Sequence, residues 1–210
     1  MNTHPKMRVL IVDDHFVVRM GVAASINAEP DMIVVAECAS AQEALAQFGA
    51  NRPDITLMDM RLPDGDGAQA IAAIRARFPE ARLIALSSHG GDADIRRALD
   101  AGAASYVFKS SPRDTLLTAI REVHRNGRHI PPEVAVRLAE AIDQPEITPR
   151  ELDVLRGIAR GRSNKEIAAD LGMSEATAKL HVTHLLRKVA AADRTQAALI
   201  ALRRGIIQLE

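Results

Sequence analysis

The sequence has a single cysteine, Cys38, among its 210 residues. An internal disulfide therefore cannot form, which excludes the disulfide-stabilised secreted domains and favours a cytoplasmic location. Apolar runs of 18 residues are also missing, so we expect no membrane span. Residues 1–8 lead directly into a strand-like run and lack the pattern of a signal peptide.

Net charge is missing as well, because 27 basic residues balance 27 acidic ones. The balance hides an asymmetry, since residues 1–127 carry 14 basic and 16 acidic residues, whereas residues 146–210 carry 11 and 8. A weakly basic C-terminal part is compatible with nucleic-acid binding, although three net charges do not establish it. The length of 210 residues favours two small domains.

Five short strand-like runs alternate with five segments of helical spacing in the first 125 residues. Strict alternation predicts a parallel sheet covered on both faces, because right-handed connections place helices on either side. We expect an α/β fold of the flavodoxin-like (βα)5 type, with five parallel strands in the order 2-1-3-4-5. The predicted strands cover residues 7–12, 32–37, 55–59, 82–86 and 105–108.

The apolar run at residues 55–58 is the centre of this pattern and ends abruptly at Asp59. A carboxylate just beyond a buried parallel strand lies at the carboxyl edge of the sheet, where open α/β folds bind ligands. The residues that follow, Pro63, Gly65 and Gly67, predict a loop that leaves this edge uncovered.

Polar residues also end the other strands. Asp13 and Asp14 follow the first strand, Ser87 ends the fourth and Lys109 follows the fifth. With Asp59, the two aspartates make three converging carboxylates, which are tolerated around a divalent cation, and an all-oxygen site suits Mg²⁺. A carboxylate held there can accept a phosphoryl group. Each residue alone is more often turn or cap chemistry, so the prediction depends on their common register.

The C-terminal part has helical spacing throughout and predicts an all-α domain of four short helices. Capping boxes at residues 148–151 and 163–166, with Ser174 and Asp193 as further N-caps, mark the starts of the helices. The turn at residues 172–174 makes a helix-turn-helix. We predict domains at residues 1–127 and 146–210, joined by a partly helical linker at residues 128–145.

The predicted helix from Ser174 to Val189 has two different faces. Lys179 and the exposed Leu180 suit a helix that enters a major groove, where lysine contacts guanine or phosphate and leucine a thymine methyl. The alternative is a solvated face on a small bundle. The expected buried face consists of Ala178, Val182, Leu185 and Val189.

The strand-end residues make residues 7–125 resemble the receiver domain of two-component response regulators. The resemblance implies that Asp59 is the phosphoacceptor and that the backbone carbonyl of Arg61 completes a Mg²⁺ site. It further implies that Tyr106, expected to be a half-buried strand residue, is an aromatic switch. The resemblance also implies that Asp13, Asp14 and Asp59 bind Mg²⁺. Ser87 would donate a hydrogen bond to the phosphoryl group, and Lys109 would pair with the same phosphoryl group.

Four motifs of the C-terminal part, at residues 148–151, 160–168, 177–181 and 194–197, resemble the LuxR-type helix-turn-helix, although Ala178 replaces a usual valine. The whole chain is thus similar to NarL/FixJ-type transcriptional response regulators. This resemblance implies a partner histidine kinase, promoter DNA, a homodimer on activation and contact with RNA polymerase. It implies base reading by Lys179, Leu180 and Thr183, and backbone contacts by Ser163, Asn164, Lys165, Thr177 and Lys188.

Two other interpretations remain open from the sequence. A Mg²⁺-dependent phosphohydrolase would normally have a second acid two residues after its nucleophile, where this chain has Arg61. We therefore expect no enzymatic activity other than self-phosphorylation and autodephosphorylation at Asp59. An orphan regulator would use the receiver only as a dimerisation or ligand module. We also expect residues 193–204 to support dimerisation through an apolar stripe of Ala197, Ile200 and Ala201.

Overall fold

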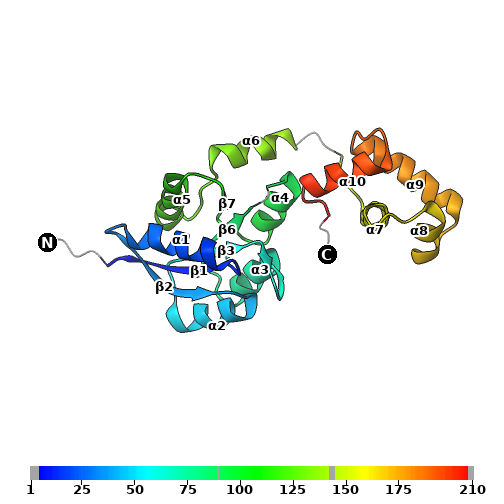
Figure 1. Ribbon diagram of the computed structural model, residues 1–210. Coiled ribbons are helices and arrows are strands. Elements are labelled where there is room, and N and C mark those ends of the chain that lie inside the picture. Colours follow the sequence, from blue (N-terminus) through cyan, green and yellow to red (C-terminus); the bar gives the residue numbers. More distant parts are fainter. Residues whose placement is uncertain (1–4, 89, 142–144, 208–210) are drawn as a thin grey trace. The chain divides into compact units, whose positions relative to one another are not determined.

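The computed structural model describes residues 5–88, 90–141 and 145–207 (Figure 1). The chain forms two compact units, an N-terminal α/β unit and a C-terminal helical unit. The outermost residues of the predicted domains, and residues 142–144 near the C-terminal end of the predicted linker, lie outside the described residues. Within the described part of the chain, no helix is both long and apolar enough to cross a membrane.

The α/β unit contains the predicted five-stranded parallel sheet. Its strand order is β2-β1-β3-β6-β7, which confirms the predicted order 2-1-3-4-5 once a short extra hairpin is set aside. The register pairs Val12 with Met58 and Asp59 with Leu86, so the carboxyl ends of neighbouring strands are level. The strands are β1 (Met7–Val12), β2 (Met32–Cys38), β3 (Ile55–Asp59), β6 (Leu83–Ser87) and β7 (Ser105–Phe108).

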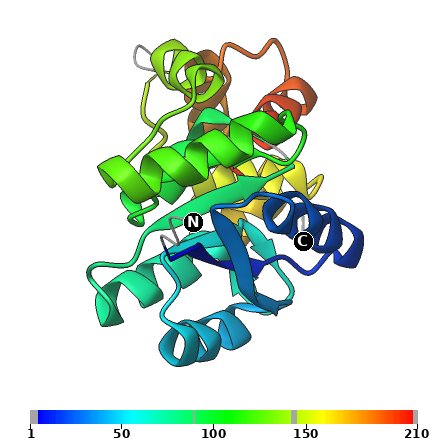
Figure 2. The same cartoon turned by 90° about the vertical axis from the view of Figure 1, so that its left-hand side faces the viewer.

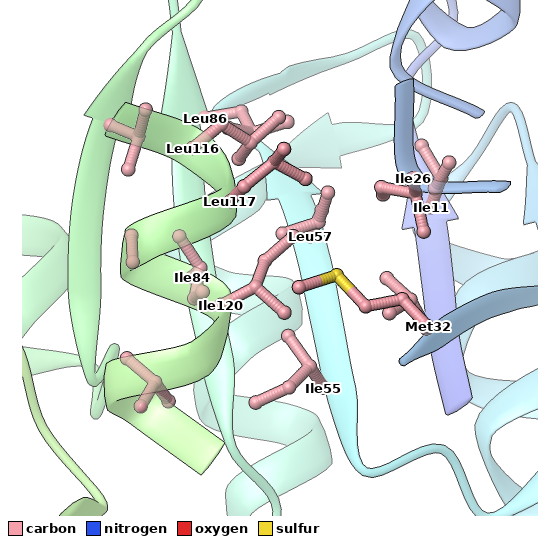
Figure 3. Close-up of a cluster of buried hydrophobic side chains, with 14 of the residues drawn as sticks. Ile11, Ile26, Met32, Ile55, Leu57, Ile84, Leu86, Leu116, Leu117 and Ile120 are labelled. Atoms are coloured by element: carbon pink, nitrogen blue, oxygen red, sulfur yellow. The ribbon is translucent and has the colours of Figure 1, made fainter. Parts of the chain in front are cut away.

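Helices cover both faces of the sheet, as the alternation predicts. On one face, α1 and α5 enclose a core in which Leu117 and Ile120 meet Leu57 of the central strand (Figure 3). On the other face, Phe48 of α2 stacks on Phe78 after α3, with ring centroids 4.8 Å apart. The helices are α1 (Phe16–Asn27), α2 (Ala41–Asn51), α3 (Gly67–Arg77), α4 (Asp92–Asp100) and α5 (Arg113–Asn126), and Figures 1 and 2 show the unit from two sides.

The segment after β3, predicted to be a loop, contains a short antiparallel hairpin. Its strands are β4 (Arg61–Leu62) and β5 (Gly65–Asp66), and Arg61 pairs with Asp66. Two-residue strands leave no apolar pattern in a sequence, so only the turn residues between them were recognisable. The hairpin gives the carboxyl edge of the sheet a defined rim.

The predicted linker contains helix α6 (Pro132–Glu140), in line with its partly helical pattern. Helix α5 begins at Arg113, and Pro112 takes its N-cap position. Pro112 has an extended ψ of 148°, so it precedes the helix instead of forming its first turn.

Each of the four helices of the helical unit begins after its predicted N-cap residue. The side chains of Thr148, Ser163, Ser174 and Asp193 each accept a hydrogen bond from a backbone N–H three residues later. Both predicted capping boxes form. The helices are α7 (Pro149–Ala159), α8 (Asn164–Asp170), α9 (Glu175–Lys188) and α10 (Arg194–Arg203).

The apolar stripe expected to serve dimerisation on α10 is used inside the unit. Ala197 and Ala201 are fully buried in the core that α7, α8 and α9 share, and Ile200 packs partly against it. Ala197 and Ala201 therefore do not form the exposed stripe that we expected, whereas a role of residues 193–204 in dimerisation stays a prediction. Their spacing marks a buried face, and a sequence does not tell which neighbour covers it. The exposed apolar residue of this helix is Leu199.

A buried ion pair connects α7 to the end of α9. The Glu151 carboxylate accepts hydrogen bonds from the Thr148 N–H at 2.9 Å and from the Lys188 ammonium at 2.7 Å. Burial of Glu151 by itself raises its pKa, but these donors outweigh burial and lower the pKa below the ordinary value of 4.5. The unfolded chain therefore binds a proton at Glu151 more readily than the folded one.

We expect Glu151→Gln to destabilise the helical unit at pH 7 by roughly 1–3 kcal/mol, because Lys188 loses its charged partner. In the native chain this contribution is present above the unfolded pKa and is lost as the pH falls through the lowered folded pKa. Urea unfolding followed by circular dichroism at pH 7 and pH 3.5 checks this. The exposed Glu175→Gln is the control, and a native pH dependence in the Glu151 variant would contradict the assignment.

Candidate functional site

Three carboxylates meet at the carboxyl edge of the sheet. Asp13 follows β1 and Asp59 ends β3, and both are buried, whereas Asp14 and His15 are exposed. One ligand atom from each of these four residues lies within 4.8 Å of the others. The structure thus brings together the predicted acidic residues and leaves the group open to solvent on one side.

Lys109 lies between the two buried carboxylates. Its ammonium nitrogen is 2.6 Å from Asp59 Oδ2 and 2.7 Å from Asp13 Oδ2. The backbone N–H of Lys109 also donates to the Ser87 carbonyl at 2.8 Å, which holds the start of the following segment against the end of β6. The Lys109 ammonium therefore neutralises part of the combined negative charge of Asp13 and Asp59. The hydrogen bond of its backbone N–H also holds Lys109 in place.

Asp59 has a raised pKa. Burial is the main cause, and the nearby Asp13 adds to it, while the hydrogen bond and the charge of Lys109 oppose it. The Arg61 N–H also donates to Asp59 Oδ1 at 3.2 Å. Because the opposing contacts only partly offset burial, an additional cation at this edge would stabilise the ionised carboxylate.

The fourth and fifth strands supply the remaining predicted residues. Ser87, at the end of β6, is 5% exposed and lies level with Phe108 of β7. Tyr106 is completely buried, not half-buried as expected, and its ring meets that of Phe108 edge to face at 5.6 Å. Both faces of β7 are covered at this position, and the sequence does not report that coverage.

His15 and Arg19 belong to the site and were not predicted. The His15 N–H donates to Asp13 Oδ1 at 2.9 Å, and its Nδ1 lies 2.8 Å from Asp14 Oδ1. The Arg19 guanidinium donates to the carbonyl of Asp13 and pairs with Glu37 at 3.4 Å. These contacts orient the two aspartates, and the only signal in the sequence was that both residues follow them closely.

Gly67 is a further residue whose role the sequence left unclear. A Cβ at this position would lie 2.1 Å from the Asp59 carbonyl oxygen and 2.7 Å from Met60 Cα. The Gly67 N–H donates to the Met60 carbonyl at 3.1 Å, which closes the loop onto the end of β3. The close approach of two backbone segments therefore requires glycine here.

In the helical unit, α9 presents the predicted exposed face. Lys179, Leu180 and Thr183 are exposed, with Leu180 54% accessible, while Ala178 and Leu185 are fully buried on the opposite side. The Thr183 hydroxyl donates to the Lys179 carbonyl at 3.0 Å. The helix therefore offers a cationic and an apolar side chain next to each other on one surface.

The predicted backbone-contact residues differ in their surroundings. Ser163 and Lys165 are exposed at the start of α8, and the Thr177 hydroxyl pairs with Ser174 Oγ at 2.8 Å. Asn164 is partly buried. Lys188 stands apart, because its ammonium binds Glu151 and the Glu146 carbonyl inside the unit. A contact from Lys188 to DNA stays a prediction that would compete with this pairing.

Comparison with known families agrees with this geometry. The family described as response regulator receiver domain matches residues 9–121, and the family described as bacterial regulatory proteins, luxR family, matches residues 145–201. The chain belongs to the response regulators. Its family comprises DNA-binding transcription regulators of two-component signalling and not enzymes, which decides against the phosphohydrolase alternative.

Relatives of this response regulator match along almost the whole chain. Response regulator protein VraR of Staphylococcus aureus strain Mu3 is 36% identical over 207 residues, which are 96% of this chain and 99% of the relative. A LuxR-family response regulator from Aurantimonas sp. SI85-9A1 is 38% identical with a TM-score of 0.62, over 65% of this chain and 97% of that structure. A complex of RcsB with DNA is 25% identical with a TM-score of 0.73, over 95% and 99%.

At the Mg²⁺ site that the sequence predicts, we expect Gly67→Ala to weaken Mg²⁺ binding. We also expect it to destabilise the α/β unit by about 1–3 kcal/mol, because the added Cβ forces the loop away from Asp59. Calorimetric titration with Mg²⁺ and thermal unfolding measure the two effects. Gly21→Ala is the matched control, since nothing lies within 4 Å of its Cβ, and alanine there should stabilise α1 slightly. Native Mg²⁺ affinity in the Gly67 variant would contradict the assigned role.

Proposed function

We propose that a partner sensor histidine kinase phosphorylates this response regulator on Asp59. A carboxylate oxygen of Asp59 forms the bond to phosphorus while the bond from phosphorus to the donor's imidazole nitrogen breaks. The observation that carries this proposal is the pairing of Asp59 with Lys109 at 2.6 Å, next to two further carboxylates at an open sheet edge. The Lys109 charge is then close to the group that gains negative charge.

The donor set fits Mg²⁺, because its carboxylate oxygens lie within 4.8 Å of one another. Asp13, Asp14 and Asp59 would hold the ion together with the backbone carbonyl of Arg61. The Met60 carbonyl already accepts from Gly67, which supports the next carbonyl as the ligand. When bound, Mg²⁺ would neutralise charge on the phosphoryl oxygens and on the carboxylates around it.

Two side chains at the ends of β6 and β7 would complete the phosphoryl site. The Ser87 hydroxyl would donate a hydrogen bond to the phosphoryl group, and Lys109 would pair with it. Tyr106 lies on β7 three residues before Lys109, and its register partner on β6 lies two residues before Ser87. This position supports its proposed role as the switch. A change at Ser87 and Lys109 would then alter the packing of a buried aromatic ring.

Double-stranded promoter DNA would bind the helical unit through α9. The exposed Lys179, Leu180 and Thr183 would read base edges in the major groove, as the likeness to RcsB in complex with DNA supports. Contacts to the DNA backbone would come from Ser163, Asn164, Lys165 and Thr177. Lys188 would contribute only if it leaves Glu151.

At the level of the whole chain, we propose a receiver domain at residues 1–127, a linker at residues 128–145 and a DNA-binding domain at residues 146–210. Phosphorylation would favour a homodimer on an operator with two half-sites. The protein would act in the cytoplasm, where kinase, DNA and RNA polymerase are accessible to it.

Intact mass after incubation with Mg²⁺ and a small-molecule phosphodonor tests the phosphoacceptor. We expect one phosphoryl adduct on the native chain, and none on Asp59→Asn or when Mg²⁺ is omitted. Asp54→Asn, which changes a carboxylate on the N-terminal side of β3, is the control and should be phosphorylated normally. An adduct that persists in Asp59→Asn would place the phosphoacceptor elsewhere, and its absence from a folded native chain would favour the orphan interpretation.

Lys179→Ala should lower affinity for DNA about tenfold or more, because a single base or phosphate contact contributes roughly 1–3 kcal/mol. Suitable duplexes can be selected from a random pool with the native protein, and affinity measured by fluorescence anisotropy at fixed salt. Lys6→Ala removes the same charge from an exposed position of the α/β unit and serves as control. Equal losses in both variants would show a non-specific charge effect and contradict base reading.

A further inference from the structure

The hairpin beside the acidic site is fastened to a helix distant in sequence. Asp64 lies between β4 and β5, and its carboxylate accepts hydrogen bonds from the Ala41 N–H and the Gln42 N–H, both at 2.9 Å. These two amides are the first of helix α2. The Asp64 carboxylate therefore accepts hydrogen bonds from helix amides that have no acceptor within the helix, and it lies at the positive end of the helix dipole. More than twenty residues of chain separate it from these amides.

Helix α2 also has a local cap, which makes the contact of Asp64 additional. Ser40 Oγ accepts from the Glu43 N–H at 3.2 Å, and the Glu43 carboxylate accepts from the Ala39 N–H at 2.8 Å. The pKa of Asp64 lies below its usual value because of the two amide donors, so the carboxylate is charged at neutral pH. Ser40 thus serves one amide of the helix start and Asp64 serves the first two, so that the long-range bonds join the hairpin to α2.

The remaining anchors of the segment after β3 lie at its two ends. The Met60 N–H donates to the Leu86 carbonyl at 3.0 Å, and the Gly67 N–H donates to the Met60 carbonyl. At the far end, Asp66 caps α3 by accepting from the Ala68 N–H at 2.9 Å. Among the contacts described for the tip of the hairpin, the two hydrogen bonds of Asp64 are those that connect the tip to helix α2.

We propose that Asp64 is a positioning residue for the phosphorylation site. By binding the start of α2, it fixes the hairpin whose first residue is Arg61. The N–H of Arg61 donates to Asp59, and its carbonyl would be a ligand of Mg²⁺. This inference rests on the proposed function of Asp59 and Arg61. It deepens that function, because it makes the geometry of the site depend on the N-terminus of α2.

The test compares Asp64→Ala with Ser40→Ala in the full chain. Both variants remove a cap from the same helix, but only the first releases the hairpin. We measure Mg²⁺ affinity by calorimetry, amide hydrogen exchange over residues 60–67, and thermal unfolding. For Asp64→Ala we expect Mg²⁺ to bind about tenfold more weakly, as for other residues that orient metal ligands, with faster exchange in the hairpin. Ser40→Ala should lower thermal stability similarly and leave both other measurements native.

Asp64→Asn provides a second variant that keeps an acceptor oxygen in place. Its Mg²⁺ affinity should lie between those of the native chain and Asp64→Ala, because one of the two amide contacts survives. Native Mg²⁺ affinity and native exchange in both Asp64 variants would overturn the proposal and leave Asp64 as a helix cap only. An equal loss of Mg²⁺ affinity in Ser40→Ala would overturn it too, because the loss would then come from the helix cap and not from the hairpin.

Failure of the underlying function gives a different result. If the native chain gains no phosphoryl adduct and binds no Mg²⁺, the proposed role of Asp59 fails before Asp64 is tested. If the native chain does both, any difference between Asp64→Ala and Ser40→Ala reports on positioning. The exchange measurement without Mg²⁺ shows separately whether Asp64 holds the hairpin.

Discussion

The salt bridge that Lys109 makes with both Asp13 and Asp59 is the interaction on which the site depends. Two buried carboxylates would repel each other and raise the cost of keeping either one charged. The ammonium at 2.6 and 2.7 Å offsets part of that cost, and a parallel sheet supplies the geometry because its strand ends are level. The remaining excess of negative charge is the electrostatic basis for the proposed binding of Mg²⁺.

Backbone geometry limits how that site can be built. Asp59 is fixed by β3, and the segment that follows turns back at once, since the Gly67 N–H donates to the Met60 carbonyl. The turn succeeds because Gly67 allows two backbone segments to approach within a distance that a Cβ would prevent. The hairpin that results is short, so its stability depends on contacts with the helix termini around it.

Local signals in the sequence predicted most of the fold. The strand–helix alternation and the four N-caps of the helical unit follow from patterns within a few residues. The strand order and the convergence of the aspartates follow from the topology of (βα)5 folds, and the structure shows them too. The full burial of Tyr106, the internal use of Ala197 and Ala201, and the pairing of Lys188 with Glu151 did not follow. Each depends on a partner that is distant in sequence, and periodicity shows that a face is buried without showing what covers it.

The same distinction explains why the two faces of α9 were easier to interpret than its end. Ala178 and Leu185 repeat with the helical period, so the exposed position of Leu180 between them is a direct consequence. An apolar side chain that remains 54% exposed on a helix otherwise anchored in a core has lost the stabilisation of burial. The proposed contact of Leu180 with an apolar base edge would recover part of this stabilisation. Lys188, held by Glu151, stabilises the helix that presents Leu180.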